Sequence, residues 1–354
     1  MVLPDLQATM SLCLKSFRVN LISFPCKDRD LWAHPIVNNV AFKKSRGDHF
    51  FHYTENSTEI SIIADVNTIS TCFTKTKNRN FLKLPGVYRV FQIDNQLADS
   101  PSKRINEISL NLATEGISIF YLCTYQTDFL LVQESSVQTA VEILNGWAKT
   151  LSKANQLEFL IELENGKIIP LSASLSRELL PASSATSVLI DDVFRYNVQK
   201  LSPQFISNSR LTMAGLNSDL LENWALDMIR LLLYPDNIKR SSDSVNDPLA
   251  SDRFISFTTS SEGASVIAED ESLDYFDSYL LNRDQDSTCL RLIQISLNRF
   301  DQDSHGLVHT FSHPFACTGI DLLYLSTFGT ANLLIKDSDI EEVTNILQAL
   351  NNDS

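Results

Sequence analysis

The segment GISIFYLCTYQTDFLLV (residues 116–132) is nearly repeated as GIDLLYLSTFGTANLLI (residues 319–335). Eight of the 17 positions are identical, whereas average composition alone would give about two matches. Two unrelated strands with similar composition are the alternative, but the flanking segments also repeat. A repeat of this kind indicates that one structural unit occurs more than once in the chain.

Each copy predicts a hairpin, because β-rich residues stand on both sides of a short polar break. A strand and a helix are expected before each hairpin, and a helix after it. The second copy's first helix should be weaker or kinked at Pro314. This is the order of the ferredoxin-like βαββαβ unit, an antiparallel sheet with both helices on one face. The expected strands are 87–93 and 290–295, and the expected helices are 103–113, 137–144, 307–316 and 340–347.

Two further units follow the same order less clearly. One has strand 17–24, helix 30–37 and hairpin 50–64; the other has strand 210–216, helix 220–233 and hairpin 254–268. The sequence thus predicts an α+β protein of four modules in two pairs. The expected boundaries are 10–78, 83–150, 207–285 with a polar insert near 239–250, and 286–351, with residues 151–206 as linker or irregular structure.

Length and composition limit the class of protein. A chain of 354 residues exceeds a usual single core, so two lobes are expected. The net charge of −14, without a basic stripe, argues against binding to nucleic acid or an anionic membrane. No signal peptide or transmembrane segment is expected, since the first residues lack a basic region and no apolar run reaches about 18 residues. The six cysteines show no CxxC spacing, which favours a reduced cytosolic setting.

Motifs for catalysis or cofactor binding are missing from the sequence. There is no GxGxxG, Walker A, GxSxG or HExxH segment. His305, His309 and His313 are spaced by four, as metal ligands on one helical stripe would be. The preferred interpretation is structural, because His305 should precede the helix and Pro314 should disturb its end. We therefore expect no enzyme, no metal and no cofactor.

A binding site is better supported at the start of the helix after Gly306. A glycine there lets a ligand approach the backbone, and free N–H groups at a helix N-terminus attract a carboxylate. Asp301 and Asp303 lie just before it and could meet an α-amino group. Together these groups could hold an amino acid by its two constant charges; an ordinary capped helix is the alternative.

Three strings resemble one known family. They are LCTYQTDFLLV (122–132), LWAHPI (31–36) and YLSTF (324–328). They are similar to strings of the CASTOR family of tandem ACT-domain proteins, so the four modules are expected to be ACT modules. The resemblance implies a cytosolic arginine sensor that binds a GATOR complex upstream of TOR complex 1. In that family the amino acid lies between the second and fourth modules and releases the partner.

The resemblance also assigns roles to residues. With Asp303 from the argument above, the implied ligand-binding residues are Ser118, Ile119, Asp303, Gly306, Leu307, Val308, Thr327 and Phe328. The implied partner-binding residues are Tyr125, Gln126 and Asp128. A homodimer is left open.

One departure from the family bears on the ligand. The family carries an aspartate for the guanidinium where this chain has Ala331, and an acid where it has Ser304. Asp321, Asp303 or Asn332 could compensate; otherwise the ligand is another amino acid or the site is empty. The leading hypothesis is an amino-acid-responsive regulator of TOR signalling. The alternatives are a ligand-independent scaffold and an allosteric subunit of an amino-acid metabolic enzyme.

Overall fold

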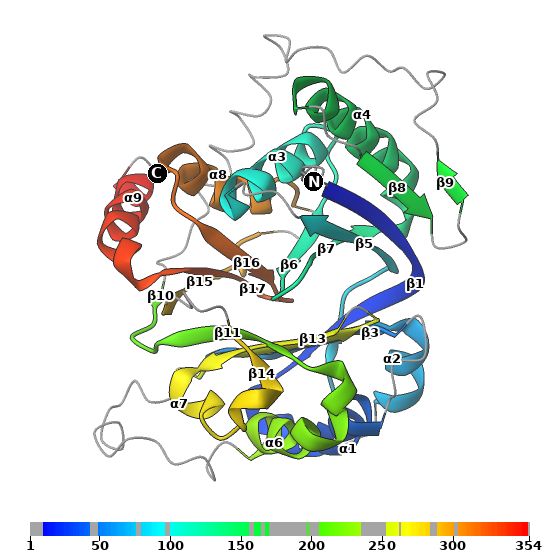
Figure 1. The fold of residues 1–354 in the computed structure, drawn as a ribbon, viewed down its shortest axis with the longest axis vertical. Coiled ribbons are helices and arrows are strands. Elements are labelled where there is room, and N and C mark those ends of the chain that lie inside the picture. The colour runs from blue at the N-terminus through cyan, green and yellow to red at the C-terminus, as the bar shows by residue number, and fades with distance from the viewer. Residues whose placement is uncertain are drawn as a thin grey trace, which may run out of the picture.

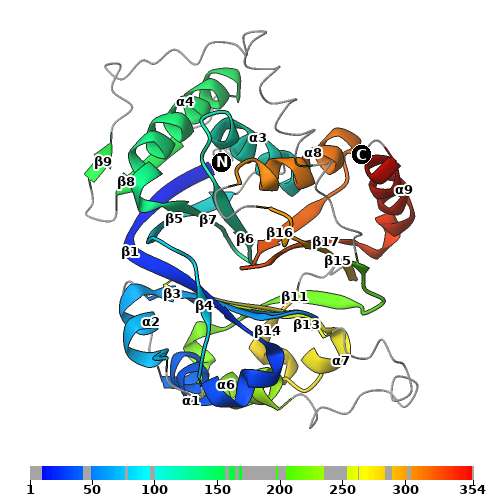
Figure 2. The same ribbon diagram turned by 180° about the vertical axis from the view of Figure 1, so that it is seen from behind.

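The protein has four layers, with two sheet layers inside and helices on both outer faces (Figures 1 and 2). The fold is seen in a computed structural model of the 354-residue chain. The structure describes residues 10–42, 49–75, 79–95, 100–155, 159–163, 167–169, 197, 205–234, 253–261, 263–283, 289–300 and 304–352.

The first sheet layer is built from the two repeat segments. The first contributes β5 (Tyr88–Asn95), α3 (Pro101–Ala113), β6 (Ile119–Cys123), β7 (Asp128–Gln133), α4 (Val137–Asn155) and β8 (Phe159–Leu163). The second contributes β15 (Leu290–Ser296), α8 (Leu307–Thr318), β16 (Leu322–Ser326), β17 (Thr330–Lys336) and α9 (Ile340–Asn352). Helices α3, α4, α8 and α9 cover the outer face of this layer (Figure 1).

The second sheet layer has the same order of elements twice. One set is β1 (Met10–Phe24), short helical turns that include α1 (Ala33–Val37), β2 (Phe51–Glu55), β3 (Ile60–Asp65), α2 (Val66–Cys72) and β4 (Leu82–Lys83). The other is β11 (Leu211–Leu216), α6 (Leu221–Leu233), β12 (Ile255–Ser260), β13 (Gly263–Glu269), α7 (Asp270–Leu273) and β14 (Leu281–Asn282). Helices α1, α2, α6 and α7 lie on the outer side of this layer (Figure 2).

Strand β1 belongs to both layers. Its first part pairs with β5 and β8, its second part pairs with β3 and β4, and the register shifts between Leu14 and Arg18. A third apolar core fills the space between the layers, beside one core under each set of helices. In this middle core the ring of Phe50 meets that of Phe129 edge-on, 5.1 Å between centroids. The two layers therefore share a packed interior.

The two repeat copies join edge to edge with local twofold symmetry. Strands β6 and β16 pair antiparallel at Leu122 and Leu325, which are equivalent positions of the repeat. The backbone N–H of Tyr121 donates to Ser326 Oγ at 3.0 Å, and that of Tyr324 donates to Cys123 Sγ at 3.2 Å. The two donors, Tyr121 and Tyr324, occupy equivalent positions of the repeat, and so do the two acceptors, Cys123 and Ser326. Strands β2 and β12 pair in the same antiparallel way in the second layer.

The structure corrects three sequence-based expectations. The interval 151–206 is not uniformly irregular, since it contains the end of α4, β8, β9 (Lys167–Ile169) and β10 (Phe205–Ile206). Helix α8 ends at Thr318, two residues beyond the expected end at residue 316, and includes Pro314. Strand β1 begins at Met10 rather than near residue 17, because it extends into the other layer. The predicted polar insert at 239–250 lies outside the described residues.

No helix among the described residues is long and apolar enough to cross a membrane.

Candidate functional site

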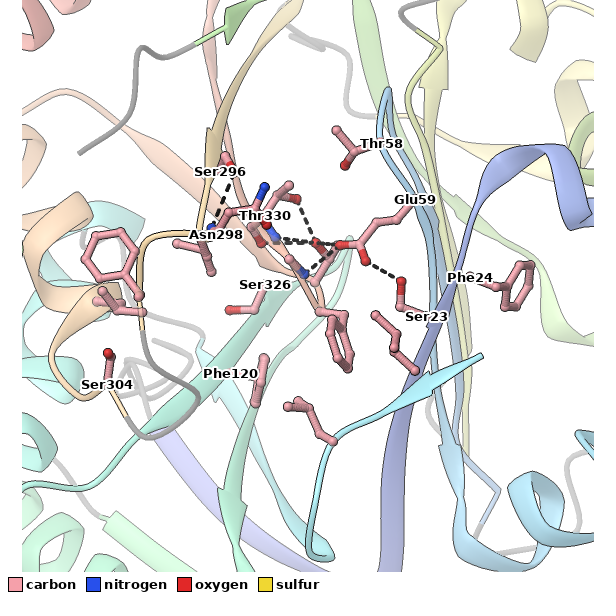
Figure 3. A pocket seen from close by; sticks show the side chains of 18 of the residues that line it. Ser23, Phe24, Thr58, Glu59, Phe120, Ser296, Asn298, Ser304, Ser326 and Thr330 are labelled. Atoms are coloured by element: carbon pink, nitrogen blue, oxygen red, sulfur yellow. Dashed lines mark hydrogen bonds between the residues drawn. The ribbon is translucent and has the colours of Figure 1, made fainter. Parts of the chain in front are cut away.

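A cavity of about 670 Å³ opens between the two layers, beside the edge where the repeat copies meet (Figure 3). The start of β6, the loop before α8 and the β16–β17 turn enclose one side. The end of β1, the turn before β3 with Thr58 and Glu59, and the segment 80–88 enclose the other. The lining residues used below are Asp28, Glu59, Ser118, Ile119, Phe120, Ser304, Leu307, Val308, Tyr324, Ser326, Thr327, Phe328 and Thr330.

The loop before α8 presents the helix start to the cavity. Gly306 is the N-terminal cap and has a φ of 75°, a left-handed conformation that favours glycine. Its carbonyl accepts bonds from the backbone N–H and hydroxyl of Thr310, at 2.8 and 2.9 Å. Ser118 Oγ donates to the carbonyl of Ser304 at 3.0 Å, which ties β6 to this loop. The first N–H groups of α8 have no acceptor within the helix and can bind an anion.

The β16–β17 turn forms the opposite end of the cavity. Thr327 Oγ1 and the backbone N–H of Gly329 donate to Glu59 Oε1, at 2.8 and 2.7 Å. The N–H of Phe328 donates to Ser61 Oγ at 3.2 Å. Strand β3 of the second layer and the residue before it therefore fix the conformation of a turn in the first layer.

Most of the predicted ligand-binding residues meet in this cavity. Ser118, Ile119, Leu307, Val308, Thr327 and Phe328 line it. Gly306 lies directly between the lining residues Ser304 and Leu307. Asp303, and the neighbouring Asp301, lie outside the described residues.

Two of the proposed replacements for the missing acid, Asp321 and Asn332, do not line the cavity, and the third, Asp303, lies outside the described residues. Ala331 is fully buried in the core beneath α8. Asp321 accepts hydrogen bonds from Lys336 Nζ and Ser100 Oγ, each at 2.8 Å, and these bonds outweigh burial and lower its pKa. Asn332 is fully buried, and its Nδ2 donates to the carbonyl of Leu325 at 3.1 Å.

The sequence analysis missed Glu59. Its side chain is 8% exposed, it lines the cavity and it points toward the β16–β17 turn (Figure 3). No sequence signal identifies it, because its contacts with Thr327 and Gly329 join positions far apart in the chain.

The predicted partner-binding residues differ in exposure. Gln126 is exposed at the tip of the β6–β7 turn. Tyr125 is half-buried; its N–H donates to Ser265 Oγ at 3.0 Å. Asp128 is 5% exposed and accepts hydrogen bonds from Arg104 Nη2 at 2.7 Å and Tyr121 Oη at 2.9 Å. In this conformation Asp128 is part of the interior rather than the surface.

The histidine and cysteine side chains do not form a metal site in the described part of the chain. No group of three or more metal-ligating side chains occurs there. His305 precedes α8 as predicted. His313 Nε2 lies 3.5 Å from Cys317 Sγ, a neighbour that the sequence analysis had not considered. Cys123 is buried, and burial together with Asp128 raises the pKa of its thiol well above the ordinary range.

Comparison with known proteins identifies relatives of the whole chain. Residues 84–146 match the family model of the ACT domain. The cytosolic arginine sensor for mTORC1 subunit 1 of Rattus norvegicus is 23% identical over 345 residues, covering 96% of this chain and 97% of that protein. The Homo sapiens protein of the same name is 22% identical over 346 residues, covering 96% and 98%.

Solved structures add only a weak likeness. Aspartate kinase from Synechocystis aligns with a TM-score of 0.30 and 9% identity, covering 98% of this chain and 56% of the kinase. The family resemblance seen in the three sequence strings is confirmed by the relatives. Along almost its whole length the chain is similar to the cytosolic arginine sensors for mTORC1, as a divergent relative, and its residues 84–146 match the ACT-domain family model.

Proposed function

We propose that the protein is a non-enzymatic, cytosolic amino-acid-binding regulator of TOR complex 1 signalling that acts through a GATOR-type complex. The observation that carries the proposal is the cavity between the layers, where six of the eight predicted ligand residues meet. The likeness to arginine sensors over 96% of the chain supports arginine as the first ligand to test. These relatives are named as sensors rather than enzymes.

The proposed architecture is four ACT modules in two pairs. The modules are residues 10–78, 83–150, 207–285 and 286–351, with β8 following the second. The recurring order of elements supports this division. The pairings β6–β16 and β2–β12 support joining the second module to the fourth and the first to the third.

In the proposed binding mode, the α-carboxylate of the amino acid meets the free N–H groups at the start of α8. The positive end of the helix dipole favours an anion at this position. The ligand side chain then extends toward Thr327 and Phe328 in the β16–β17 turn. Ser118 and Ile119 form the wall between the two ends. Because this wall begins β6, a ligand here would bias the β6–β7 turn, where we propose Tyr125 and Gln126 as partner-binding residues. Asp128 is buried in this conformation, so it would act on the partner surface only by holding the turn.

Calorimetry with the twenty amino acids tests the proposal directly. We expect one micromolar binder, and we expect Gly306→Asp to abolish binding because a second carboxylate would occupy the place of the ligand's own. The same substitution should leave the far-UV circular dichroism unchanged, which separates loss of the site from loss of the fold. The sensor proposal fails if no amino acid binds at millimolar concentration.

A second candidate is a ligand-independent scaffold with the same fold. The observation in its favour is Ala331, which is buried where the family carries its guanidinium-binding acid. This candidate predicts that capture of a GATOR-type complex is insensitive to arginine but is lost when the exposed Gln126 and the neighbouring Tyr125 are changed to alanine. Capture that decreases as arginine is added rules the scaffold out.

A further inference from the structure

Three carboxylates are buried in the part of the chain that the structure describes: Glu55, Glu59 and Asp128, with exposures of 2%, 8% and 5%. Two of them have arginine partners from the chain itself. Glu55 is bonded by Arg29, and Arg253 Nη1 approaches it at 3.2 Å. Asp128 is bonded by Arg104 Nη2 at 2.7 Å.

Glu59 differs from the other two because its partners are neutral. Thr327 Oγ1 and the Gly329 N–H donate to Oε1, and Ser23 Oγ donates to Oε2. No lysine, arginine or histidine of the described residues pairs with it. A buried charge without a counter-charge is unfavourable in the absence of other compensation. Three of about four acceptor positions of the carboxylate are used, which leaves room for a further donor.

The lining of the cavity beside Glu59 likewise carries negative charge without positive charge to balance it. Among the described residues, the charged side chains that line the cavity are those of Asp28 and Glu59, and none is basic. Figure 3 shows Glu59 to the upper right of Ser326 and Phe120, with its carboxylate next to the β16–β17 turn. A cation in the cavity would therefore supply the counter-charge that Glu59 lacks.

We infer that Glu59, contributed by the second layer, is the specificity-determining residue that receives the cationic side chain of the bound amino acid. This inference rests on the proposed function. It assigns a ligand with a positively charged side chain and replaces the acid that is absent at Ala331. The ligand's carboxylate meets α8, and its cationic end meets Glu59 at the other end of the cavity. The ligand thus bridges the two layers.

The test compares L-arginine with L-citrulline, which has nearly the same shape but a neutral side chain. Calorimetry is done on the full chain and on Glu59→Gln, which keeps the size and removes the charge. Wild-type protein should prefer arginine by about 10- to 100-fold, the ratio expected for a charged hydrogen bond. In Glu59→Gln the affinity for arginine should fall by the same factor, and that for citrulline should change less than about threefold.

Asp28→Asn is the matched control, because it removes the same charge from the same cavity at a half-buried position. Its effect should be at most about threefold, since more exposed charges interact weakly. An equal loss in Asp28→Asn would show a general field effect and overturn the assignment of Glu59. Arginine preference retained in Glu59→Gln, or wild-type preference for citrulline, would also overturn it while leaving the proposed function intact. Binding of no amino acid by wild-type protein would instead overturn the proposed function.

Discussion

At the scale of single residues, the two repeat copies differ most where charge is involved. The buried positions Ile105, Ile108 and Leu112 of α3 correspond in spacing to Val308, Phe311 and Phe315 of α8. By the same spacing, Arg104 corresponds to Leu307, as Asp128 does to Ala331. The first copy therefore contains both members of a buried ion pair, and the second contains neither. Residues of both copies line the cavity, and no arginine of the described residues is among them.

The role of Asp128 can be separated from that of Gln126. We expect Asp128→Ala to lower the free energy of unfolding by about 3 kcal/mol, because it leaves the guanidinium of Arg104 buried and unpaired. Gln126→Ala should change it by less than about 0.5 kcal/mol, since Gln126 is exposed. Urea denaturation of both variants measures the difference. An Asp128→Ala variant as stable as the wild-type protein would mean that the ion pair contributes little. Loss of partner binding in Gln126→Ala tests the binding surface more directly, because that substitution should leave the fold unchanged.

His309 predicts a pH dependence of stability. Burial, with His313 nearby, lowers its pKa from the usual 6.5 to about 4. The unfolded chain therefore takes up a proton near pH 6.5 and the folded chain only near pH 4, so stability is complete above pH 6.5 and falls as the pH decreases toward 4. The full loss is about 3 kcal/mol. His309→Gln should flatten this dependence in urea titrations at pH 7, 6 and 5. Burial also lowers the pKa of His52, to about 3, so part of the pH dependence should remain in this variant.

At the scale of elements, the β6–β7 turn packs against a strand of the other layer. A Cβ atom at Gly215 of β11 would lie 2.5 Å from the ring of Tyr125. Gly215→Ala should therefore lower the free energy of unfolding by about 1–3 kcal/mol through overpacking. Adding Tyr125→Ala should recover part of this loss, because the two residues share one contact.

Gly329→Ala provides the control for this prediction. Its Cβ would meet Glu59 Oε1 at 3.5 Å, an ordinary contact. The variant should change stability by less than about 0.5 kcal/mol. Thermal unfolding monitored by circular dichroism compares the three variants. If Gly215→Ala is as stable as Gly329→Ala, the turn can move away from β11 without cost.

The elements could be predicted from the sequence where their pattern is local. The hairpins and the helices α3, α6, α8 and α9 follow from apolar periodicity and turn residues. Strand β8 was not predicted, because its parallel pairing with β1 joins segments far apart in the chain. Glu59 was not predicted for the same reason, since its position beside Thr327 depends on the packing of the two layers. Motif resemblance predicted only the site residues on β6, α8 and the β16–β17 turn.

At the scale of the whole molecule, the two layers should unfold together. Strand β1 pairs within both layers, and the middle core is shared by them. A ligand between the layers then stabilises the entire fold rather than one half. We expect arginine at 100 times its dissociation constant to add about 2.7 kcal/mol to the free energy of unfolding.

Native-state hydrogen exchange tests this coupling between the layers. The most protected amides of β7 in one layer and of α6 in the other should both exchange about 100-fold more slowly with arginine, because both require the same global opening. The amides at the start of α9, where Glu341 and Glu342 are exposed, should exchange at the same rate with and without arginine, which makes them the internal control. Slowing confined to β5–β7 and β15–β17 would show that the layers open separately, and the ligand would then report on one half only.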